Sequence, residues 1–540
     1  MVRVIALTLL LVTKTRHAKR TWVFVLLTMT FYHLYVDFYI KMVKNLGKLT
    51  DRTIKMSNIK QRFIYFLMAN LLLWSIVPLL RESLPMDTQE ALMWGKYCFL
   101  GTTKHPPFSG WLAYGFWDLL TQWDGAMYLL SQLCVLLGVF YIFRLAKEFV
   151  GQTKAVLAAL LQFGIIFYNF SSVEYNVNVV SLALWPMCAF YFWRGYTQNK
   201  LSDWLLFGIF AGVNLLNKYV SGLLLVAIGL FILLHPKTLK NYRLYIAGFI
   251  ALAIVAPHLW WLWQNDFAPF EYLSHRSEQG KFTSQWRHLA YPLKFIGAQI
   301  LFSAAAWLTY LVLYKINKKE KFVGDKEKSQ FLLIVGLLPL LTWFLIGIIT
   351  GSTLKSMWGF PCLFLLGTML FYFFPIQIGE KQILQVFRTM AVWTVVFAIA
   401  YAAQIILTKS ERFHSDCRQI ARQMTRIWKA ETGGKPLEYV GGNEWFTNMT
   451  AIYGEDKPKP MIWLNPKANS WFDANDFASK GALVVASNAG EYAVYQKAHE
   501  GKVSPARILP LTYKNYLGKT KTKNMFYGFY NLKEAANAQE

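Results

Sequence analysis

Charged side chains are scarce in this chain, and acidic ones are scarcer than basic ones. Asp, Glu, Lys and Arg make up 16% of the 540 residues, with 30 acids against 56 bases. The sequence also lacks an HExxH, CxxC, P-loop or Gly-rich dinucleotide motif. Zinc proteolysis, redox catalysis and nucleotide hydrolysis therefore have no support, and the missing ATP motif argues against a primary pump.

Apolar residues dominate what is present. The chain is 55% hydrophobic and 17% aromatic, with a mean hydropathy of +0.30. Long apolar runs of this kind predict a polytopic α-helical membrane protein, because lipid offers no partner to unpaired backbone groups. The net charge of +26 lies mostly in short loops between these runs, where it orients helices and meets anionic membrane lipid. Nucleic acid is not expected as a partner.

The apolar runs predict eleven membrane spans. They cover residues 63–80, 125–146, 154–171, 178–194, 203–217, 219–235, 243–263, 292–314, 330–350, 357–374 and 385–407. Basic residues then fall in every second loop, most densely at 315–328, as the positive-inside rule requires. The opposite loops hold the polar and unusual sequence, so we expect a site on the outer, periplasmic side.

The chain divides into three predicted parts. Residues 1–55 are either an upstream extension or carry an additional helix, and 56–409 form an all-α catalytic domain in the membrane. Residues 410–540 lose the long apolar runs and predict a small α/β periplasmic domain. In that domain the pattern indicates a helix at 415–431 and strands at 481–486 and 491–495.

A polar island follows the first span and contains two acids, Asp87 and Glu90. Three residues apart, they share one face of a helix and could act as a base, bind a cation or orient a basic partner. The alternative is a capping box, with Asp87 as the N-cap. The acids occur beside other outer-side charges, which favours a functional site.

Two further outer-side motifs offer cations. Lys104 and His105 precede Pro106-Pro107, and the prolines present both side chains from a rigid turn where they could hold a phosphate. The alternative is an ordinary helix-start turn. Lys218-Tyr219 lies between two apolar runs, so Lys218 should face a cavity or an anion, unless it extends to the lipid head groups.

Three more outer-side residues are candidates for the site. Glu174 lies where the third span reaches the surface, and Arg276 belongs to the segment 264–291, which is long enough to be a lid or binding loop. Lys355 begins the tenth span, where an interfacial anchor would look the same.

Together the motifs resemble a known family. They are Asp87-x-x-Glu90-Ala, Trp94-Gly95, Lys104-His105-Pro106-Pro107, Leu216-Asn-Lys-Tyr219, Pro257-His-Leu-Trp-Trp261, Leu354-Lys-Ser-Met-Trp-Gly359 and Tyr439-Val-Gly-Gly442. This set resembles the bacterial branch of the protein-mannosyltransferase-like superfamily, which includes lipid A aminoarabinose and galacturonic acid transferases. The resemblance implies the glycosyltransferase C fold and transfer of a sugar from a polyprenyl-phosphate-linked donor at the periplasmic face of the inner membrane.

The resemblance also implies roles for individual residues. Asp87 would stand at the reaction centre with Glu90 in support, Glu174 would be a second acid, and Arg276 would contact the donor phosphate. Aminoarabinose transferases carry Lys directly before the loop proline, whereas His105 stands there in this chain and Lys104 one place earlier. Either residue could therefore meet the phosphate, with Lys218 as a further contact and Tyr219 and Lys355 in support.

The expected acceptor is lipid A or another envelope glycolipid. Two other functions stay open at this point: a protein O-mannosyltransferase, and a transporter or flippase for lipid-linked sugars. The absence of paired broken spans in two halves disfavours a transporter. No cofactor is implied with certainty, and a divalent metal ion at the acids stays an open alternative.

Overall fold

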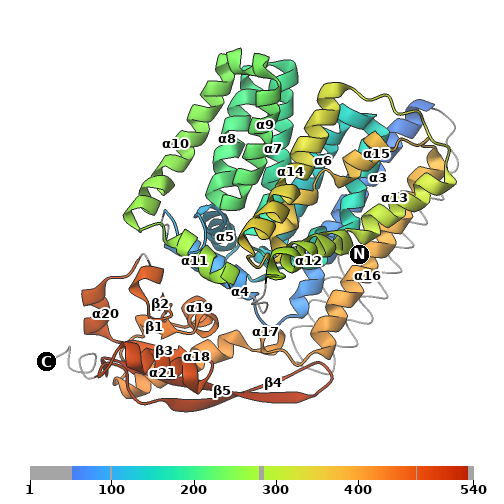
Figure 1. The fold of residues 1–540 in the computed structure, drawn as a ribbon. Coiled ribbons are helices and arrows are strands. Elements are labelled where there is room, and N and C mark those ends of the chain that lie inside the picture. Colours follow the sequence, from blue (N-terminus) through green and yellow to red (C-terminus); the bar gives the residue numbers. More distant parts are fainter. Residues whose placement is uncertain (1–51, 98–99, 279–284, 470, 533–540) are drawn as a thin grey trace.

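The computed structural model describes residues 52–97, 100–278, 285–469 and 471–532. A bundle of helices forms the larger part, and a small domain with a sheet, coloured orange and red, lies beneath one end of it (Figure 1). The predicted N-terminal extension lies outside the described residues, except that Arg52–Lys55 begin the first described helix.

The elements of the larger part follow the predicted apolar runs. In chain order they are α3 (Arg52–Ile76), η1 (Val77–Leu80), α4 (Met86–Lys96), α5 (Phe108–Leu119), α6 (Gly125–Leu160), η2 (Leu161–Gly164), η3 (Ile166–Tyr168), η4 (Phe170–Val173), α7 (Val177–Gln198), α8 (Leu201–Asn217), η5 (Tyr219–Ser221), α9 (Gly222–Leu234), η6 (Pro236–Lys240), α10 (Tyr242–Gln264), α11 (Ala268–Glu278), α12 (Arg287–Phe302), α13 (Ala304–Ile316), α14 (Lys326–Thr350), η7 (Ser356–Leu363), α15 (Leu366–Phe373) and α16 (Glu380–Leu407).

Every one of the eleven predicted spans contains helix, although several are bent or short; two of the apolar helices, Leu201–Asn217 and Tyr219–Leu234, have fewer than 18 residues. Among the described residues, five helices are long and apolar enough to cross a membrane, or up to seven when each bent pair is one span. The bent pairs are α12–α13 at 61° and η7–α15 at 51°. Two predicted spans are merged in α6, which is broken at Gly151 with φ of 74°, a value that glycine tolerates. Apolar composition marks a buried run but does not set where its helix bends.

The smaller domain contains α17 (Glu411–His414), α18 (Cys417–Glu431), β1 (Tyr439–Gly442), α19 (Glu444–Tyr453), β2 (Lys459–Ile462), η8 (Pro466–Ala468), α20 (Ala474–Lys480), β3 (Ala482–Ala486), α21 (Ala489–Ala498), β4 (Arg507–Lys514) and β5 (Thr520–Tyr530). The strands form one sheet in the order β2-β1-β3-β5-β4. The pairs β1–β2 and β1–β3 are parallel, and β3–β5 and β4–β5 are antiparallel.

The central strand β3 is buried on both faces, which explains its unbroken apolar sequence. Leu483 and Val485 belong to the hydrophobic core that includes α18 and α19, whereas Val484 packs in a second cluster on the other face. The predicted helix at 415–431 is confirmed as α18, and the strand at 481–486 as β3. The strand predicted at 491–495 is wrong, because these residues lie in α21.

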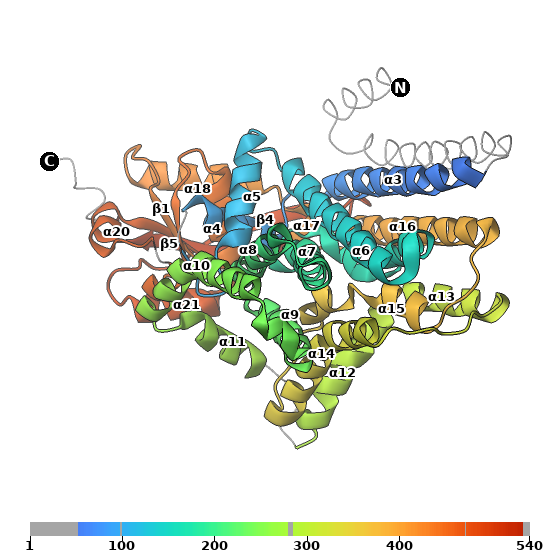
Figure 2. The same cartoon turned by 90° about the horizontal axis from the view of Figure 1, so that it is seen from above.

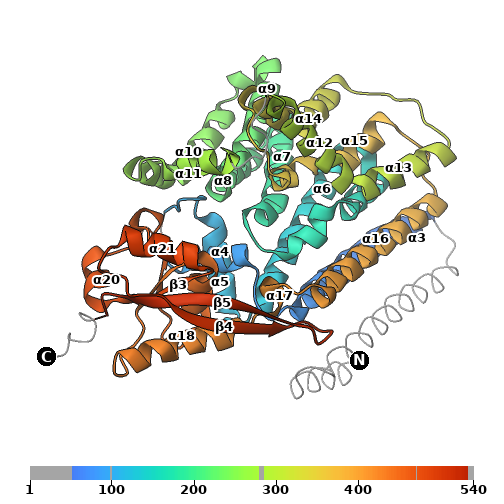
Figure 3. The ribbon, with the colours of Figure 1, turned by 60° about the horizontal axis from the view of Figure 1, so that its bottom comes forward.

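Backbone contacts join the small domain to the helical part. The N–H of Glu82 donates to the carbonyl of Phe413 at 2.9 Å, and the Tyr516 hydroxyl donates to the carbonyl of Leu80 at 2.5 Å. The β4–β5 hairpin thus reaches the ends of η1 and α16, as Figure 3 shows. At the other end of the bundle, α3 and α16 run side by side and are tied by Arg62 and Glu380 at 2.5 Å (Figure 2).

Candidate active site

The predicted site residues of the first outer loop lie on α4 and on the turn before α5. Pro85 directly precedes Met86, the first residue of α4. A proline at a helix start costs no hydrogen bond, because the first N–H groups of a helix have no partner within it. The two helices touch at glycines: a Cβ added to Gly95 would lie 1.9 Å from the carbonyl oxygen of Gly110. This close contact fixes the position of the turn that joins α4 to α5.

The turn at 100–107 is held from both sides. Within it, the Thr102 hydroxyl accepts hydrogen bonds from the backbone N–H groups of Lys104 and His105 at 3.1 and 2.9 Å. From α10, the imidazole of His258 binds the carbonyl of Leu100 at 2.7 Å through Nδ1 and the hydroxyl of Tyr219 at 2.9 Å through Nε2. Tyr219 therefore supports the loop that presents Lys104 and His105.

Lys104 lies between two carboxylates. Its Nζ is 2.5 Å from an oxygen of Glu90 on α4 and 2.5 Å from an oxygen of Glu444, the first residue of α19. The three side chains are only 8–12% exposed. The rings of Tyr272 and Trp463 lie 5.6 and 5.1 Å from the same nitrogen. We call Glu90, Lys104 and Glu444 the lysine clamp.

The clamp keeps the lysine charged. Burial alone lowers the pKa of Lys104, but the charges of Glu90 and Glu444 outweigh it and raise the pKa above its ordinary value. Burial, and after it the charge of Glu444, raises the pKa of Glu90 well above the ordinary range. Glu90 is therefore the clamp carboxylate that takes up a proton most readily.

Asp87 stands one turn away in different surroundings. The backbone N–H of Asp87 donates to a carboxylate oxygen of Glu174 at 3.3 Å, and the side-chain amide of Asn176 donates to the carboxylate of Asp87 at 3.5 Å. In the described part of the chain neither acid has a cation within ion-pair distance. We call Asp87 and Glu174 the open acid pair. Burial raises the pKa of both acids. For Glu174, repulsion from the charge of Asp87 adds to the effect of burial, and its pKa rises to about 7.

The capping-box interpretation of Asp87 and Glu90 is wrong. The residue before α4 is Pro85, which has no capping side chain, and Asp87 is already the second residue of the helix. Glu90 points to Lys104 rather than back to the helix start. Helix capping therefore does not explain the spacing of the two acids.

The other predicted cations gather around His105. Burial, and then the charges of Lys218, Lys104 and Arg276, lowers the pKa of the His105 imidazole, which is neutral as a result. Lys218, 5% exposed, donates from Nζ to the side-chain oxygen of Asn178. Arg276 lies over the ring of Tyr272 at 5.9 Å, on the helix α11 that forms part of the predicted lid segment.

Lys355 lies on the segment between α14 and η7. It precedes η7, whose Met357 sulfur is 3.9 Å from the amide of Asn178, the partner of Lys218. The segment before it is tied to α11, because the N–H of Thr353 donates to the carbonyl of Ser277 at 2.9 Å. Lys355 therefore lies on the rim that joins α11 to α7.

A metal ion does not fit the acids as they stand. Across the described ranges, no three His, Cys, Asp or Glu side chains come together closely enough to hold one. Where a cation would bridge Glu90 and Glu444, the Lys104 ammonium already does so.

Sequence reasoning missed the contribution of the small domain. Glu444 and Trp463 reach Lys104 from that domain, and Arg412 lies over the Trp445 ring at 5.2 Å with its guanidinium 2.8 Å from the Met86 sulfur. One signal was available: Glu444 follows the Tyr439-Val-Gly-Gly442 motif by two residues. Nothing in its local pattern shows that it faces Lys104, 340 positions earlier.

Comparisons with known proteins agree with the motifs. Residues 104–261 match the family model described as dolichyl-phosphate-mannose-protein mannosyltransferase. Two lipopolysaccharide core galacturonosyltransferases of Rhizobium johnstonii are similar: RgtB, 25% identical over 53% of this chain and 59% of its own, and RgtA, 23% identical over 76% and 87%. The lipid A galacturonosyltransferase RgtD of the same organism is 25% identical over 48% of this chain and 57% of its own.

The match to RgtB, like that to RgtD, spans less than two thirds of the relative's length. Among solved structures, ArnT from Cupriavidus metallidurans bound to undecaprenyl phosphate has the same fold, with a TM-score of 0.57 and 11% identity over 88% of this chain and 99% of that one. The chain thus has the glycosyltransferase C fold of ArnT, and its sequence is similar in part to the mannosyltransferase family model and to the three galacturonosyltransferases.

Proposed function

We propose that the protein transfers a sugar from a polyprenyl-phosphate-linked donor to lipid A or another envelope glycolipid, at the periplasmic face of the inner membrane. The observation that carries this proposal is the open acid pair beside a group of cations. Asp87 is half-buried without an ion pair, while the charges of Lys104, Arg276 and Arg412 all reach it. A partly buried acid with a raised pKa beside cationic side chains fits this reaction class.

The proposed mechanism follows from the bonds that change. The acceptor oxygen attacks the anomeric carbon, the bond from that carbon to the donor phosphate oxygen breaks, and its electron pair stays on the phosphate. Lys218 and Arg276 would stabilise the growing negative charge, and neutral His105 would donate a hydrogen bond. With a hydroxyl acceptor, Asp87 takes the proton. With a phosphate acceptor there is no proton to take, and Asp87 steadies the positive charge on the sugar.

Lys104 has a different part in this proposal. Both of its strong contacts are to carboxylates, so it holds Glu90 and Glu444 together and sets the position of His105, its neighbour in the turn. The clamp would thereby keep the small domain in place over the reaction centre.

The donor sugar and the acceptor are open to a direct test. The similar proteins are named as galacturonosyltransferases, and the motifs also resemble aminoarabinose transferases. Mass spectrometry of lipid A and core from cells with and without the gene should show the loss of one sugar, whose mass separates a hexuronic acid from an aminopentose. Transfer by the purified protein from the corresponding polyprenyl-phosphate sugar then confirms the activity.

Protein O-mannosylation is the second candidate, because the matching family model carries that name. It predicts an unchanged lipid A and a missing mannose on envelope proteins in the same pair of strains. Unchanged lipids and proteins together, with lipid-linked sugar retained on the cytoplasmic side, would instead indicate a flippase.

The orientation of the site is tested separately. In a variant without native cysteines, Ser479→Cys on the small domain should react with an impermeant thiol reagent in intact cells. Val323→Cys, in the basic loop before α14 and 86% exposed, should react only after the cells are opened. The reverse labelling would place the reaction on the cytoplasmic side.

A further inference from the structure

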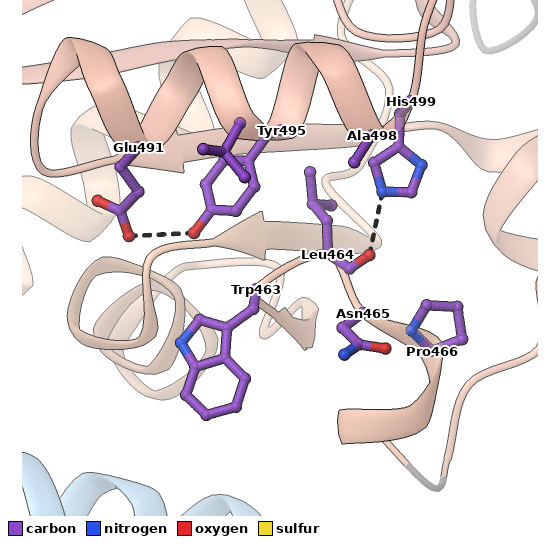
Figure 4. A pocket seen from close by; sticks show the side chains of 9 residues that line it. Trp463, Leu464, Asn465, Pro466, Glu491, Tyr495, Ala498 and His499 are labelled. Carbon is purple, nitrogen blue, oxygen red and sulfur yellow. Dashed lines mark hydrogen bonds between the residues drawn. The ribbon is translucent and has the colours of Figure 1, made fainter. Parts of the chain in front are cut away.

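A hollow in the small domain borders the lysine clamp. It is a pocket of about 540 Å³ between the segment after β2 and the helix α21 (Figure 4). Its lining includes Trp463, Asn465 and Pro466 on one wall, and Val494, Tyr495 and His499 on the other. The Trp463 ring that lines the pocket also lies 5.1 Å from the Lys104 ammonium, so the two sites share one side chain.

The backbone around Trp463 is unusual. Trp463 and Leu464 have φ of 57° and 50°, and the N–H of Asn465 donates to the carbonyl of Ile462 at 3.2 Å. A tight turn with two central residues of positive φ normally takes Asn-Gly, because other side chains strain the backbone there. Core packing explains Leu464, which is 2% exposed against Gly441. It does not explain Trp463, which the turn holds outward at 37% exposure.

The opposite wall is organised by a fixed carboxylate. Glu491 accepts hydrogen bonds from the Asn443 amide, from the N–H and hydroxyl of Ser487, and from the Tyr495 hydroxyl, at 2.7–3.2 Å. Its oxygens are therefore occupied, and its part is to hold Tyr495 against the pocket. Asn443 also caps α19, the helix that presents Glu444, so one network supports both the pocket and the clamp.

Polar groups that face the pocket remain for a ligand. The Asn465 oxygen accepts from the N–H of Lys467, but in the part of the chain that the structure describes no partner takes its amide hydrogens. His499 binds the carbonyl of Leu464 through Nε2 at 3.1 Å, which leaves Nδ1. An aromatic plane, apolar side chains and two or three hydrogen-bonding groups match one sugar ring, with its apolar C–H face and its hydroxyl rim.

We infer that this pocket is a saccharide-binding subsite that holds a sugar ring of the glycolipid acceptor, stacked on Trp463, beside the reaction centre. The inference rests on the proposed function, since that function supplies the acceptor. The volume lies in the range of small-ligand pockets, about 300–1,000 Å³. Through the shared Trp463, a sugar ring bound in the pocket would lie next to the lysine clamp.

The test uses the full-length protein purified in detergent and, as probe, fully deacylated lipopolysaccharide saccharide. Calorimetric titration should show saturable binding to the unaltered protein. Val494→Trp, at a position 64% exposed on α21, fills the pocket with a bulky side chain on the wall opposite Trp463. It should weaken probe binding and raise the KM for the acceptor at least tenfold, while kcat and the KM for the donor stay within twofold.

Trp463→Ala should lose probe binding as well, and Trp463→Phe should recover part of it. The control is Ile508→Ala, at a site 56% exposed on β4 outside the pocket, which should behave as the unaltered protein. Thermal melting verifies that each variant is folded. Absence of saturable binding by the unaltered protein, or unchanged binding by folded Val494→Trp, overturns the subsite.

The two proposals can fail separately. Saturable binding that Val494→Trp removes, in a protein that transfers no sugar from any lipid-linked donor, supports the subsite and overturns the proposed function. Efficient transfer with an acceptor KM that Val494→Trp does not change overturns the subsite and leaves the proposed function in place.

Discussion

Asp87 and Glu90 lie one turn apart on the same short helix, yet their carboxylates meet opposite surroundings. Glu90 belongs to the lysine clamp, where Lys104 lies 2.5 Å away and the small domain adds Glu444. Asp87 belongs to the open acid pair, where its backbone N–H donates to Glu174 and its side chain receives one long amide hydrogen bond. One region is built from both domains, and the other from the helical part alone.

The difference separates a positioning site from a reactive one. The charges of a fully matched buried ion pair are already satisfied and need no ligand. Removing one partner leaves the other charge unpaired. Two half-buried acids without an ion-paired cation are unfavourable for folding, so they indicate a function that needs them. We therefore expect substitutions in the open acid pair to affect chemistry, and those in the lysine clamp to affect both stability and transfer.

The largest effect is expected for Asp87→Asn. Loss of a general base or of a charge next to the reacting carbon typically lowers a rate by about 10²–10⁴-fold, and we expect at least a hundredfold loss of transfer. The melting temperature should not fall, because the substitution relieves repulsion from Glu174. Transfer by the purified variant measures the first effect and thermal melting the second.

Asp118→Asn is the matched control for this experiment. Asp118 is an exposed acid on the neighbouring helix α5, and within the described ranges its side chain accepts a hydrogen bond from Gln122 alone, at 3.3 Å. Its variant should transfer at the normal rate. An Asp87→Asn protein that unfolds, or one that stays fully active, would remove the contrast between the two regions.

Lys104→Met should have the next largest effect. The substitution leaves the carboxylates of Glu90 and Glu444 buried without their cation, which costs about 3–5 kcal/mol when one partner of a buried pair is removed. We expect a lower melting temperature and a loss of transfer of about thirtyfold, which corresponds to about 2 kcal/mol in the barrier. Glu444→Gln should show the same changes at smaller size.

The control for the clamp is Lys154→Met, which breaks a more exposed ion pair with Glu320 near the opposite end of the bundle. Pairs of that kind contribute about 0–1 kcal/mol, so stability and transfer should hardly change. If Lys104→Met were equally harmless, the small domain would not be anchored through the clamp.

Lys218→Met and Arg276→Gln are expected to lower transfer about tenfold each. A charge-assisted hydrogen bond to phosphate is worth about 1.5–3 kcal/mol, and about 1.4 kcal/mol is one decade in rate. Lys355→Met, on the rim, should lower transfer less than about threefold. Assays against a lipid-linked donor test all three, and normal rates for both Lys218 and Arg276 variants would remove the phosphate site.

The smallest effect concerns the pH dependence of stability. Burial, and then the charge of Asp87, raises the pKa of Glu174 to about 7 in the folded protein. A raised carboxyl pKa means that the folded state holds the proton more tightly, so this contribution to stability is present below the unfolded value and is lost as pH rises through about 7. The melting temperature should fall by a few degrees between pH 5 and pH 8, and Glu174→Gln should flatten that fall.

The opposite slope in the unaltered protein, or the same slope in Glu174→Gln, would mean that Glu174 is ionised at low pH. The open acid pair would then carry two charges throughout, and Asp87 would be less ready to accept a proton.

Local sequence was sufficient to predict a helix or strand whose own residue pattern fixes its secondary structure. Alternating charge and apolar residues at helical spacing placed α18, and an unbroken apolar run placed β3. The pattern failed at 491–495, where Tyr492 and Tyr495 resemble strand residues but lie three apart on the buried face of α21, which Asn488 caps. Aromatic residues occur in helices and in strands, so the Asn488 cap and the packing of α21 against the sheet determine that this segment is helical.

The candidate site was predictable residue by residue but not as an arrangement. Asp87, Glu90, Lys104 and His105 come from one loop, and their chemistry was evident from spacing and prolines. That Lys104 would be enclosed by two carboxylates, and that Lys218 and Arg276 would reach His105, depends on packing between helices far apart in the chain. Sequence alone gave no distances between those helices.

By itself, the sequence determined that this is a multi-pass membrane protein with a polar loop after its first span, because lipid forces apolar runs into helices and excludes unmatched charge. The similarity to membrane glycosyltransferases was also readable from its motifs. Only the tertiary structure decided which acid is matched and which is open, since that depends on where the small domain lies. Glu444 neutralises Lys104 from more than three hundred residues away, and ion pairing falls off with distance in space rather than along the chain.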